Sequence, residues 1–254
     1  MNVVRYVWLE LKKNICSRFF WSGVAVLFLA ALLVGHPFAQ QLADSGYSSE
    51  GTLWYVSYVY CTTTEKFLLF IPLIVPFAAS CNAEMELRSR FYIFSCSRMG
   101  KRQYLLTQSI GAALSGGLLV VCACIMLIPG LLVWSGNIQI AGEVTPRGAI
   151  AIGIFSCLLT GFLNGAFWSL VGAFLAVLSR NYHSAWGAPF VIYYVLVIFQ
   201  ERYYPSFFFL SPRYWAAPGY YSPYFCMSVL CTLSLLMGSL LIAAIKRRMD
   251  YEGS

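Results

Sequence analysis

The chain has 254 residues, of which 59% are hydrophobic and only 11% are charged, and its formal net charge is +7 with a mean hydropathy of +0.70. Soluble domains usually have about a quarter of their residues charged, so this composition excludes an ordinary soluble domain and indicates an integral membrane protein. The basic residues lie in short segments between apolar runs, and this distribution argues against a nucleic-acid partner.

The first eighteen residues are predicted to form an amphipathic helix on the membrane surface. In the stretch MNVVRYVWLELKKNICSR, apolar residues recur at helical spacing, and Arg5, Lys12 and Lys13 occupy other positions. This pattern is typical of an interfacial helix. No A-x-A cleavage site follows, so we expect the segment to be retained rather than removed as a signal peptide.

Six apolar segments follow, and we expect each to form a helix that crosses the bilayer core of about 30 Å, for which roughly twenty apolar residues are needed. The segments cover residues 19–39, 65–82, 105–133, 148–178, 185–200 and 222–245. No linker separates them. The prediction is therefore an all-α integral membrane protein with one domain over residues 1–254, six transmembrane helices and an interfacial helix at residues 1–18.

The distribution of Lys and Arg predicts the orientation of these spans. Thirteen of the basic residues lie in the segments 1–18, 83–104, 179–184 and 246–254, and four lie in the segments on the other side. Cytoplasmic segments of membrane proteins carry an excess of Lys and Arg. We therefore expect a multi-pass protein of the cell membrane with both termini in the cytoplasm.

The fourth predicted span carries a ridge of small residues at every fourth position, formed by Gly153, Cys157, Gly161, Gly165, Ser169 and Ala173. Such a ridge allows two helices to approach closely, either within one chain or between two subunits. Asn164 lies in the same span. Its side chain is expected either to form a hydrogen bond to a neighbouring helix or to line a substrate path.

The connection between spans five and six, ERYYPSFFFLSPRYWAAPGYY at residues 201–221, is rich in aromatic residues and proline. Aromatic side chains prefer the depth of the membrane interface, and the prolines divide the segment into short pieces. Two interpretations remain open for this broken outer segment. It is either an aromatic belt or an outer gate, for which the candidate residues are Phe208, Tyr214 and Trp215.

Several motifs of catalysis are missing from the sequence. It has no P-loop, and the string LSGGL at residues 114–118 lies inside the third span, where it is interpreted as glycines for helix packing. The nine cysteines form no C-x-x-C pair, so no metal site is expected. The spans contain no ionisable carboxylate or basic side chain except Glu65 and Lys66 at one rim. The chain is therefore predicted not to be an enzyme and to bind no cofactor of its own.

In layout the chain resembles the ABC-2-type permeases, the membrane subunits of bacterial ATP-binding-cassette exporters. The likeness in sequence is concentrated in EMELRSRFYIFSCSRMGKRQYLL, where the residues matching the family pattern are Ser97, Arg98, Gly100, Lys101, Tyr104 and Leu105. Two positions depart from that pattern. Arg90 stands where many relatives have Gly, and Gln108 stands where many have Lys.

This resemblance implies a homodimer or heterodimer of such chains, surrounded by membrane lipids, on two cytoplasmic ATPase subunits that bind ATP and Mg²⁺. It also implies that the charged segment after span two couples the chain to the ATPase, with the candidate residues Glu84, Glu86, Leu87, Arg88, Phe91, Phe94, Arg98 and Lys101.

The residues of this segment support the same interpretation independently. Glu84 and Arg88, like Glu86 and Arg90, have the (i, i+4) spacing that favours ion pairs along one helix. Leu87, Phe91 and Phe94 would then form an apolar stripe for docking, and removal of the charges alone would have little effect. The alternative is that the charges only set topology and contact lipid headgroups.

Two functions are consistent with the sequence. The first is a permease that exports an amphipathic or lipid-like cargo, such as an antimicrobial peptide, with energy from a separate ATPase. The second is a non-transporting membrane scaffold or immunity protein that sequesters a peptide or recruits partners. The second hypothesis predicts a function that survives when the ATPase is catalytically inactive.

Overall fold

The computed structural model describes residues 3–44, 53–135, 147–216 and 221–252, and every element in these ranges is a helix. In chain order the elements are α1 (Val3–Ile15), α2 (Arg18–Asp44), α3 (Leu53–Thr63), α4 (Glu65–Ala79), α5 (Asn82–Arg88), α6 (Tyr92–Met99), α7 (Lys101–Ser135), α8 (Arg147–Ser179), α9 (Ser184–Tyr203), the 3-10 helix η1 (Phe208–Leu210), α10 (Arg213–Ala216) and α11 (Pro223–Glu252). The all-α prediction is confirmed for these residues.

Five helical stretches are long and apolar enough to cross a membrane: Arg18–Phe38, Glu65–Arg88, Lys101–Val133, Gly148–Ser179 and Pro223–Tyr251. They correspond to five of the six predicted spans. The remaining predicted span, 185–200, forms α9, whose 20 residues give a helix of about 30 Å. α9 contains Pro189, Gln200 and three tyrosines, and it is not among the five stretches that qualify by length and composition.

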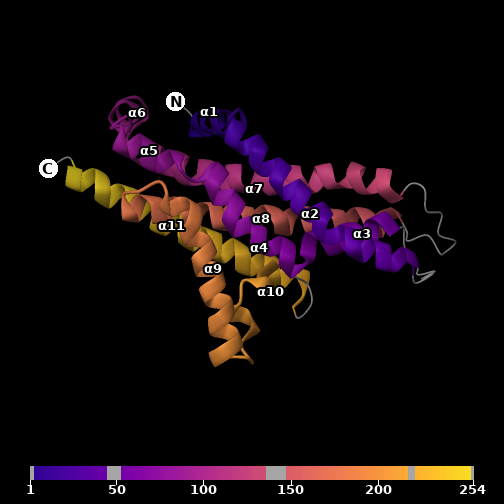
Figure 1. The fold of residues 1–254 in the computed structure, drawn as a ribbon. Coiled ribbons are helices and arrows are strands. Elements are labelled where there is room, and N and C mark those ends of the chain that lie inside the picture. The colour runs from indigo at the N-terminus through magenta and orange to yellow at the C-terminus, as the bar shows by residue number, and fades with distance from the viewer. Residues whose placement is uncertain (1–2, 45–52, 136–146, 217–220, 253–254) are drawn as a thin grey trace.

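The long helices α2, α4, α7, α8 and α11 run along a common direction and form the body of the molecule (Figure 1). α7 packs against α8, α11 packs against α8, and α2 packs against both α4 and α7. In contrast, α9 points away from this bundle (Figure 1). The interior is filled by large apolar side chains from several helices, including Leu27, Ile71, Leu119, Trp168 and Leu230.

The ridge of small residues in α8 packs inside the chain. A Cβ atom added to Gly116 of α7 would lie 2.7 Å from the carbonyl oxygen of Gly165, and one added to Gly165 would lie 2.5 Å from the carbonyl oxygen of Gly116. The Ser169 hydroxyl donates a hydrogen bond of 2.8 Å to the carbonyl of Ala112 on α7. At this crossing the intramolecular alternative is confirmed, and so is the interpretation of LSGGL as packing glycines.

The four segments with an excess of basic residues meet at one end of the bundle, which we call the basic end. Lys13 pairs with Glu86, Lys101 with Asp250, and Arg248 with Glu84, so these ion pairs join segments 1–18, 83–104 and 246–254. Arg180 lies over the ring of Tyr251, which brings in the fourth segment. α1, α5, α6 and the C-terminus lie together, whereas α3 lies at the opposite end (Figure 1). The predicted grouping is confirmed.

The chain turns sharply between α5 and α6. α5 ends at Arg88, and Arg90 has a φ of 57°, in the left-handed region that favours glycine. Because the helix stops before Arg90, the predicted (i, i+4) pair between Glu86 and Arg90 is wrong.

Candidate functional site

Two glutamates of α5 anchor this short helix to three other helices at the basic end. Successive residues of an α-helix are rotated by about 100°, so Glu84 and Glu86 point to different sides of α5. Both side chains are buried, and Glu84 is 0% exposed. We call Glu84, Glu86 and the side chains that bind them the carboxylate clamp. Its other members are Arg248 of α11, Lys13 of α1, and Tyr104 and Gln108 of α7.

Glu84 forms an ion pair with Arg248. The guanidinium Nη1 donates to Oε2 of the carboxylate, and the Arg248 side chain is 9% exposed. An isolated buried charge carries a large desolvation penalty, and the attraction between the two opposite charges offsets it. This pair therefore fixes the end of α11 to α5.

Glu86 receives three hydrogen bonds from two other helices. Nζ of Lys13 donates to Oε1 at 2.9 Å, while Oε2 accepts from Nε2 of Gln108 at 2.6 Å and from the hydroxyl of Tyr104 at 3.2 Å. Lys13 supplies the positive charge, and Gln108 supplies a neutral donor. A second polar contact supports the same junction, because Nδ2 of Asn82 donates to Oδ1 of Asn14.

A third carboxylate, Glu10 of α1, lies beside this junction, 3.5 Å from Nζ of Lys13. Burial raises the pKa of Glu10, the nearby Lys13 opposes this shift, and the charge of Glu86 adds to it. For Lys13, burial acts to lower the pKa, but the carboxylates of Glu10 and Glu86 outweigh it, so its pKa is raised. An open pocket of about 320 Å³ adjoins these groups and is also lined by Tyr6 and Phe91.

Glu10 is expected to make the stability of the chain depend on pH. Its pKa in the folded chain is raised above the ordinary value of 4.5, so the ionised form is disfavoured by folding. Stability should therefore fall as pH rises from 4.5 through the folded pKa, and should then level off. Glu10→Gln removes this dependence. Thermal unfolding of the two detergent-solubilised chains is measured from pH 4.5 to neutral. The melting temperature of Glu10→Gln relative to the unmodified chain should rise with pH, and a constant difference would contradict the prediction.

The predicted coupling residues divide into two groups in the structure. Glu84, Glu86 and Leu87 point into the protein, and Leu87 is only 1% exposed. The continuous apolar stripe predicted for Leu87, Phe91 and Phe94 is therefore wrong, because the chain turns at Arg90 before reaching α6. The exposed members are Arg88, Phe91, Phe94, Arg98 and Lys101.

The exposed aromatic rings of this region lie at the basic end. Phe91 is 55% and Phe94 is 68% exposed, and their ring centroids are 6.3 Å apart. We call this pair the α6 aromatic pair. Lys101, which was predicted to belong to the coupling surface, pairs with Asp250 of α11. Two exposed aromatic side chains therefore lie at the start of α6. The preceding helix, α5, is bound to other helices by Glu84 and Glu86.

At the opposite end, the predicted outer-gate residues fold back onto the bundle. The rings of Phe208 and Tyr214 pack edge to face with centroids 5.4 Å apart. Trp215 is buried: its Nε1 donates to the carbonyl of Phe209 at 2.6 Å, and its ring packs 5.6 Å from that of Phe167 on α8. These contacts bring the three candidates close to one another.

A further anchor holds this outer segment in place. Nη1 of Arg213 lies 2.6 Å from Glu201 of α9, and its Nε lies 3.6 Å from Glu65 of α4. One arginine therefore connects α10 to the end of α9 and to the start of α4. The described part of the outer segment therefore packs on the bundle as a cap, and Arg213 binds it to the rim that contains Glu65.

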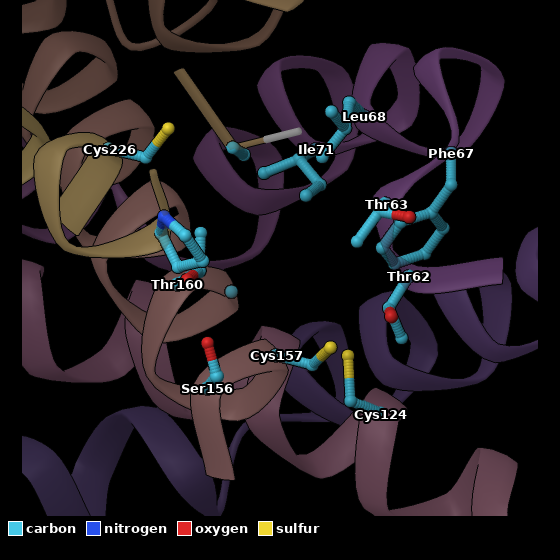
Figure 2. A pocket seen from close by; sticks show the side chains of 13 residues that line it. Thr62, Thr63, Phe67, Leu68, Ile71, Cys124, Ser156, Cys157, Thr160 and Cys226 are labelled. Carbon is cyan, nitrogen blue, oxygen red and sulfur yellow. The ribbon is translucent and has the colours of Figure 1, made fainter. Parts of the chain in front are cut away.

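A small cavity of about 30 Å³ lies beneath this cap, and its wall is formed by residues from six helices, α3, α4, α7, α8, α10 and α11 (Figure 2). Its wall includes Thr62, Thr63, Phe67, Leu68, Ile71, Cys124, Ser156, Cys157, Thr160, Gly161, Ala216, Pro223 and Cys226. This volume accommodates only about one or two water molecules. Asn164, the candidate for the substrate path, is buried in α8 and is not one of the residues of this wall.

Within the described part of the chain, no group of three or more His, Cys, Asp or Glu is placed to hold a metal ion. In comparisons with protein-family models and with curated proteins, none matches this sequence.

Proposed function

We propose that this chain is an integral membrane permease subunit of an ATP-binding-cassette exporter and that a separate cytoplasmic ATPase supplies the energy. The observation that supports this proposal is the combination of an internal clamp and an external contact at the basic end. α5 is bound to α7 and α11 by buried polar contacts and to α1 by the half-exposed Lys13, while the adjoining α6 aromatic pair is exposed. This arrangement suits an element that receives force from a partner and transmits it to several helices.

The carboxylate clamp is strong enough for this role. Breaking a buried ion pair typically costs about 3–5 kcal/mol, whereas an exposed pair contributes about 0.2–1 kcal/mol. A partner that displaces α5 would therefore move α11 with it through the Glu84–Arg248 pair, and α7 through the buried contacts of Glu86. Arg88 and Arg98 are exposed and are assigned a minor, electrostatic part in docking.

The cargo is proposed to pass between two chains rather than through one. The cavity under the outer cap, at about 30 Å³, is far smaller than an amphipathic peptide or a lipid. The five apolar helical stretches contain few ionisable groups, which is compatible with an amphipathic or lipid-like cargo such as an antimicrobial peptide. We therefore propose a homodimer or heterodimer in which Phe208, Tyr214 and Trp215 cap the outer end of the path.

α9 is proposed as the sixth span. The segment before α2 and the end of α11 both lie at the basic end, as their ion pairs with the α5 region show. A chain that starts and finishes at the same end of a membrane bundle crosses it an even number of times. Five stretches qualify by length and composition, and α9, with 20 residues, is the helix that completes the set.

Site-directed labelling tests the proposed topology. In a variant that retains only Cys96, which is partly exposed on α6, a membrane-impermeant maleimide should react in inside-out vesicles and not in intact cells. A cysteine-free variant carrying Ser206→Cys, an exposed position after α9, should show the opposite result. Labelling of Cys96 from outside intact cells would overturn the cytoplasmic assignment of the basic end.

The central experiment tests whether the α6 aromatic pair binds the ATPase. Phe91→Ala with Phe94→Ala should weaken co-purification of the ATPase by about tenfold or more, because burial of one such ring contributes roughly 1.5–3 kcal/mol. Arg88→Ala with Arg98→Ala should have a much smaller effect. Phe155→Ala with Phe207→Ala, two exposed rings elsewhere, provides a matched control and should bind the ATPase normally.

Three outcomes distinguish the alternatives. If the aromatic variant binds normally and the arginine variant fails, the basic end contacts headgroups instead of a docked ATPase. If the chain never co-purifies with an ATPase, the exporter proposal fails. If protection against a peptide survives with a catalytically inactive ATPase, the chain acts as a scaffold or immunity protein rather than as a permease.

A further inference from the structure

A groove of about 460 Å³ lies at the basic end between α8 and α11, two helices that pack side by side (Figure 1). It is separate from the carboxylate clamp except at Arg248, which borders both. Its lining consists of an apolar part and a charged part: Phe174, Val177, Leu178, Leu240, Ala243 and Ala244 form the first, and Arg180, Arg247, Arg248 and Tyr251 form the second.

The charged part carries excess positive charge. Arg248 is neutralised by its ion pair with Glu84, so Arg180 and Arg247 supply the net charge of the groove. Both are exposed. Cζ of Arg180 lies 5.5 Å from the centroid of the Tyr251 ring, a cation–π distance that orients the guanidinium over the groove rim. The residues that line the groove include no carboxylate.

The apolar part continues onto the surface of the two helices. Leu178 is 62% and Leu240 is 41% exposed, and each lies in a helix that is long and apolar enough to cross a membrane. The apolar wall therefore begins where the arginines end and runs toward the middle of the bundle. A ligand that fits this surface has a compact anionic head and a long apolar tail.

We propose that this groove binds an anionic phospholipid, with its phosphate on Arg180 and Arg247 and one acyl chain along Leu178 and Leu240. A guanidinium presents a planar fork of donors that matches phosphate geometry, and basic pockets between transmembrane helices on the cytoplasmic side suit anionic headgroups. A zwitterionic lipid fits less well, since its ammonium group meets arginines and no acid. The inference rests on the membrane location in the proposed function and not on an ATPase partner.

The test uses the purified, detergent-solubilised full chain after removal of bound lipid. Phosphatidylglycerol or phosphatidylcholine is titrated in, and bound lipid is counted by native mass spectrometry. Phosphatidylglycerol should bind more tightly than phosphatidylcholine. Arg180→Gln with Arg247→Gln should weaken phosphatidylglycerol binding by about tenfold to thirtyfold. Arg5→Gln with Arg102→Gln removes the same charge from exposed positions outside the groove and should leave binding unchanged.

Two further variants distinguish the contribution of the lipid headgroup to binding from that of the acyl chain. Arg180→Lys with Arg247→Lys keeps the charge but loses the forked geometry, and should bind with intermediate affinity. Leu178→Asn with Leu240→Asn keeps the arginines and should weaken lipid binding without changing the response to inorganic phosphate, which should compete only weakly with the lipid in every variant.

The following results would overturn the proposal. An equal loss of phosphatidylglycerol binding in the groove variant and in the matched arginine control would indicate that surface charge alone attracts the lipid. Equal binding of the two lipids, or full displacement by inorganic phosphate, would contradict an anionic lipid site with an acyl wall. A chain dimer that is lost on Arg180→Gln with Arg247→Gln would assign the groove to a second copy. Because no ATPase is present, failure here leaves the ATPase-binding experiment unaffected.

Discussion

Replacing Arg248 with methionine is expected to destabilise the chain by about 3–5 kcal/mol, the usual cost of removing one partner of a buried ion pair. Glu84 is fully buried, and the Arg248 side chain is 9% exposed. The variant leaves a buried carboxylate without the guanidinium that faces it. Unfolding in mixed micelles with increasing sodium dodecyl sulfate, followed by tryptophan fluorescence, measures the loss.

Two variants control for the effect of Arg248→Met. Arg247→Met changes the neighbouring exposed arginine and should alter stability by no more than about 0.5 kcal/mol. The double variant Glu84→Gln with Arg248→Met removes both charges and should recover much of the loss, because no ion remains buried. Equal stabilities of Arg247→Met and Arg248→Met would show that the buried pair does not hold α11 to α5.

Gly116→Leu is expected to prevent normal packing of α7 on α8, at a cost of about 3 kcal/mol, near the upper end for an overpacked core. A Cβ atom at this position would lie 2.7 Å from the carbonyl oxygen of Gly165. That neighbour is backbone, so it cannot move aside as a flexible side chain can. The expected result is strongly reduced accumulation of folded chain in the membrane fraction, measured by detergent extraction and size-exclusion chromatography.

Gly187→Leu is the matched control for this helix-packing prediction. Gly187 lies in α9, is exposed, and has no atom within 4 Å of an added Cβ. Leucine should be tolerated there, because it meets no neighbour and favours the helix more than glycine does. If Gly116→Leu accumulates as well as Gly187→Leu, the close approach of α7 and α8 is not required for folding.

Features that depend on periodicity could be predicted from the sequence. Hydropathy over long windows located five stretches that the structure confirms as long apolar helices. A run of about twenty apolar residues is a strong signal, because it is the length that a membrane-spanning helix needs. The four-residue spacing of Gly161, Gly165 and Ser169 predicted a close helix crossing, and the structure places it on α7. The excess of Lys and Arg correctly grouped four segments at one end.

The partners of the carboxylates could not be predicted in the same way. Local spacing assigned Glu84 to Arg88 and Glu86 to Arg90. α5 does extend through Arg88, but Glu84 is buried and pairs with Arg248, whereas Arg88 is exposed. The turn at Arg90 ends that helix, and the ion pairs instead join residues 73 and 164 positions apart. A useful signal was present: the charge distribution placed the basic residues of segments 1–18 and 246–254 at the same end as Glu84 and Glu86, where they can pair with these acids. Because Glu84 is buried in an ion pair, its replacement by alanine is expected to have a large effect on stability, unlike the removal of an exposed charge.

The separation of 164 residues between Glu84 and Arg248 has a consequence for biogenesis. Glu84 is translated and reaches the membrane long before the last helix is synthesised, so its carboxylate cannot pair with Arg248 until α11 is inserted. During that time the carboxylate is either hydrated or bound by the insertion machinery. Closure of the ion pair then coincides with completion of the bundle. A chain interrupted before α11 would lack the guanidinium that pairs with Glu84 in the complete bundle.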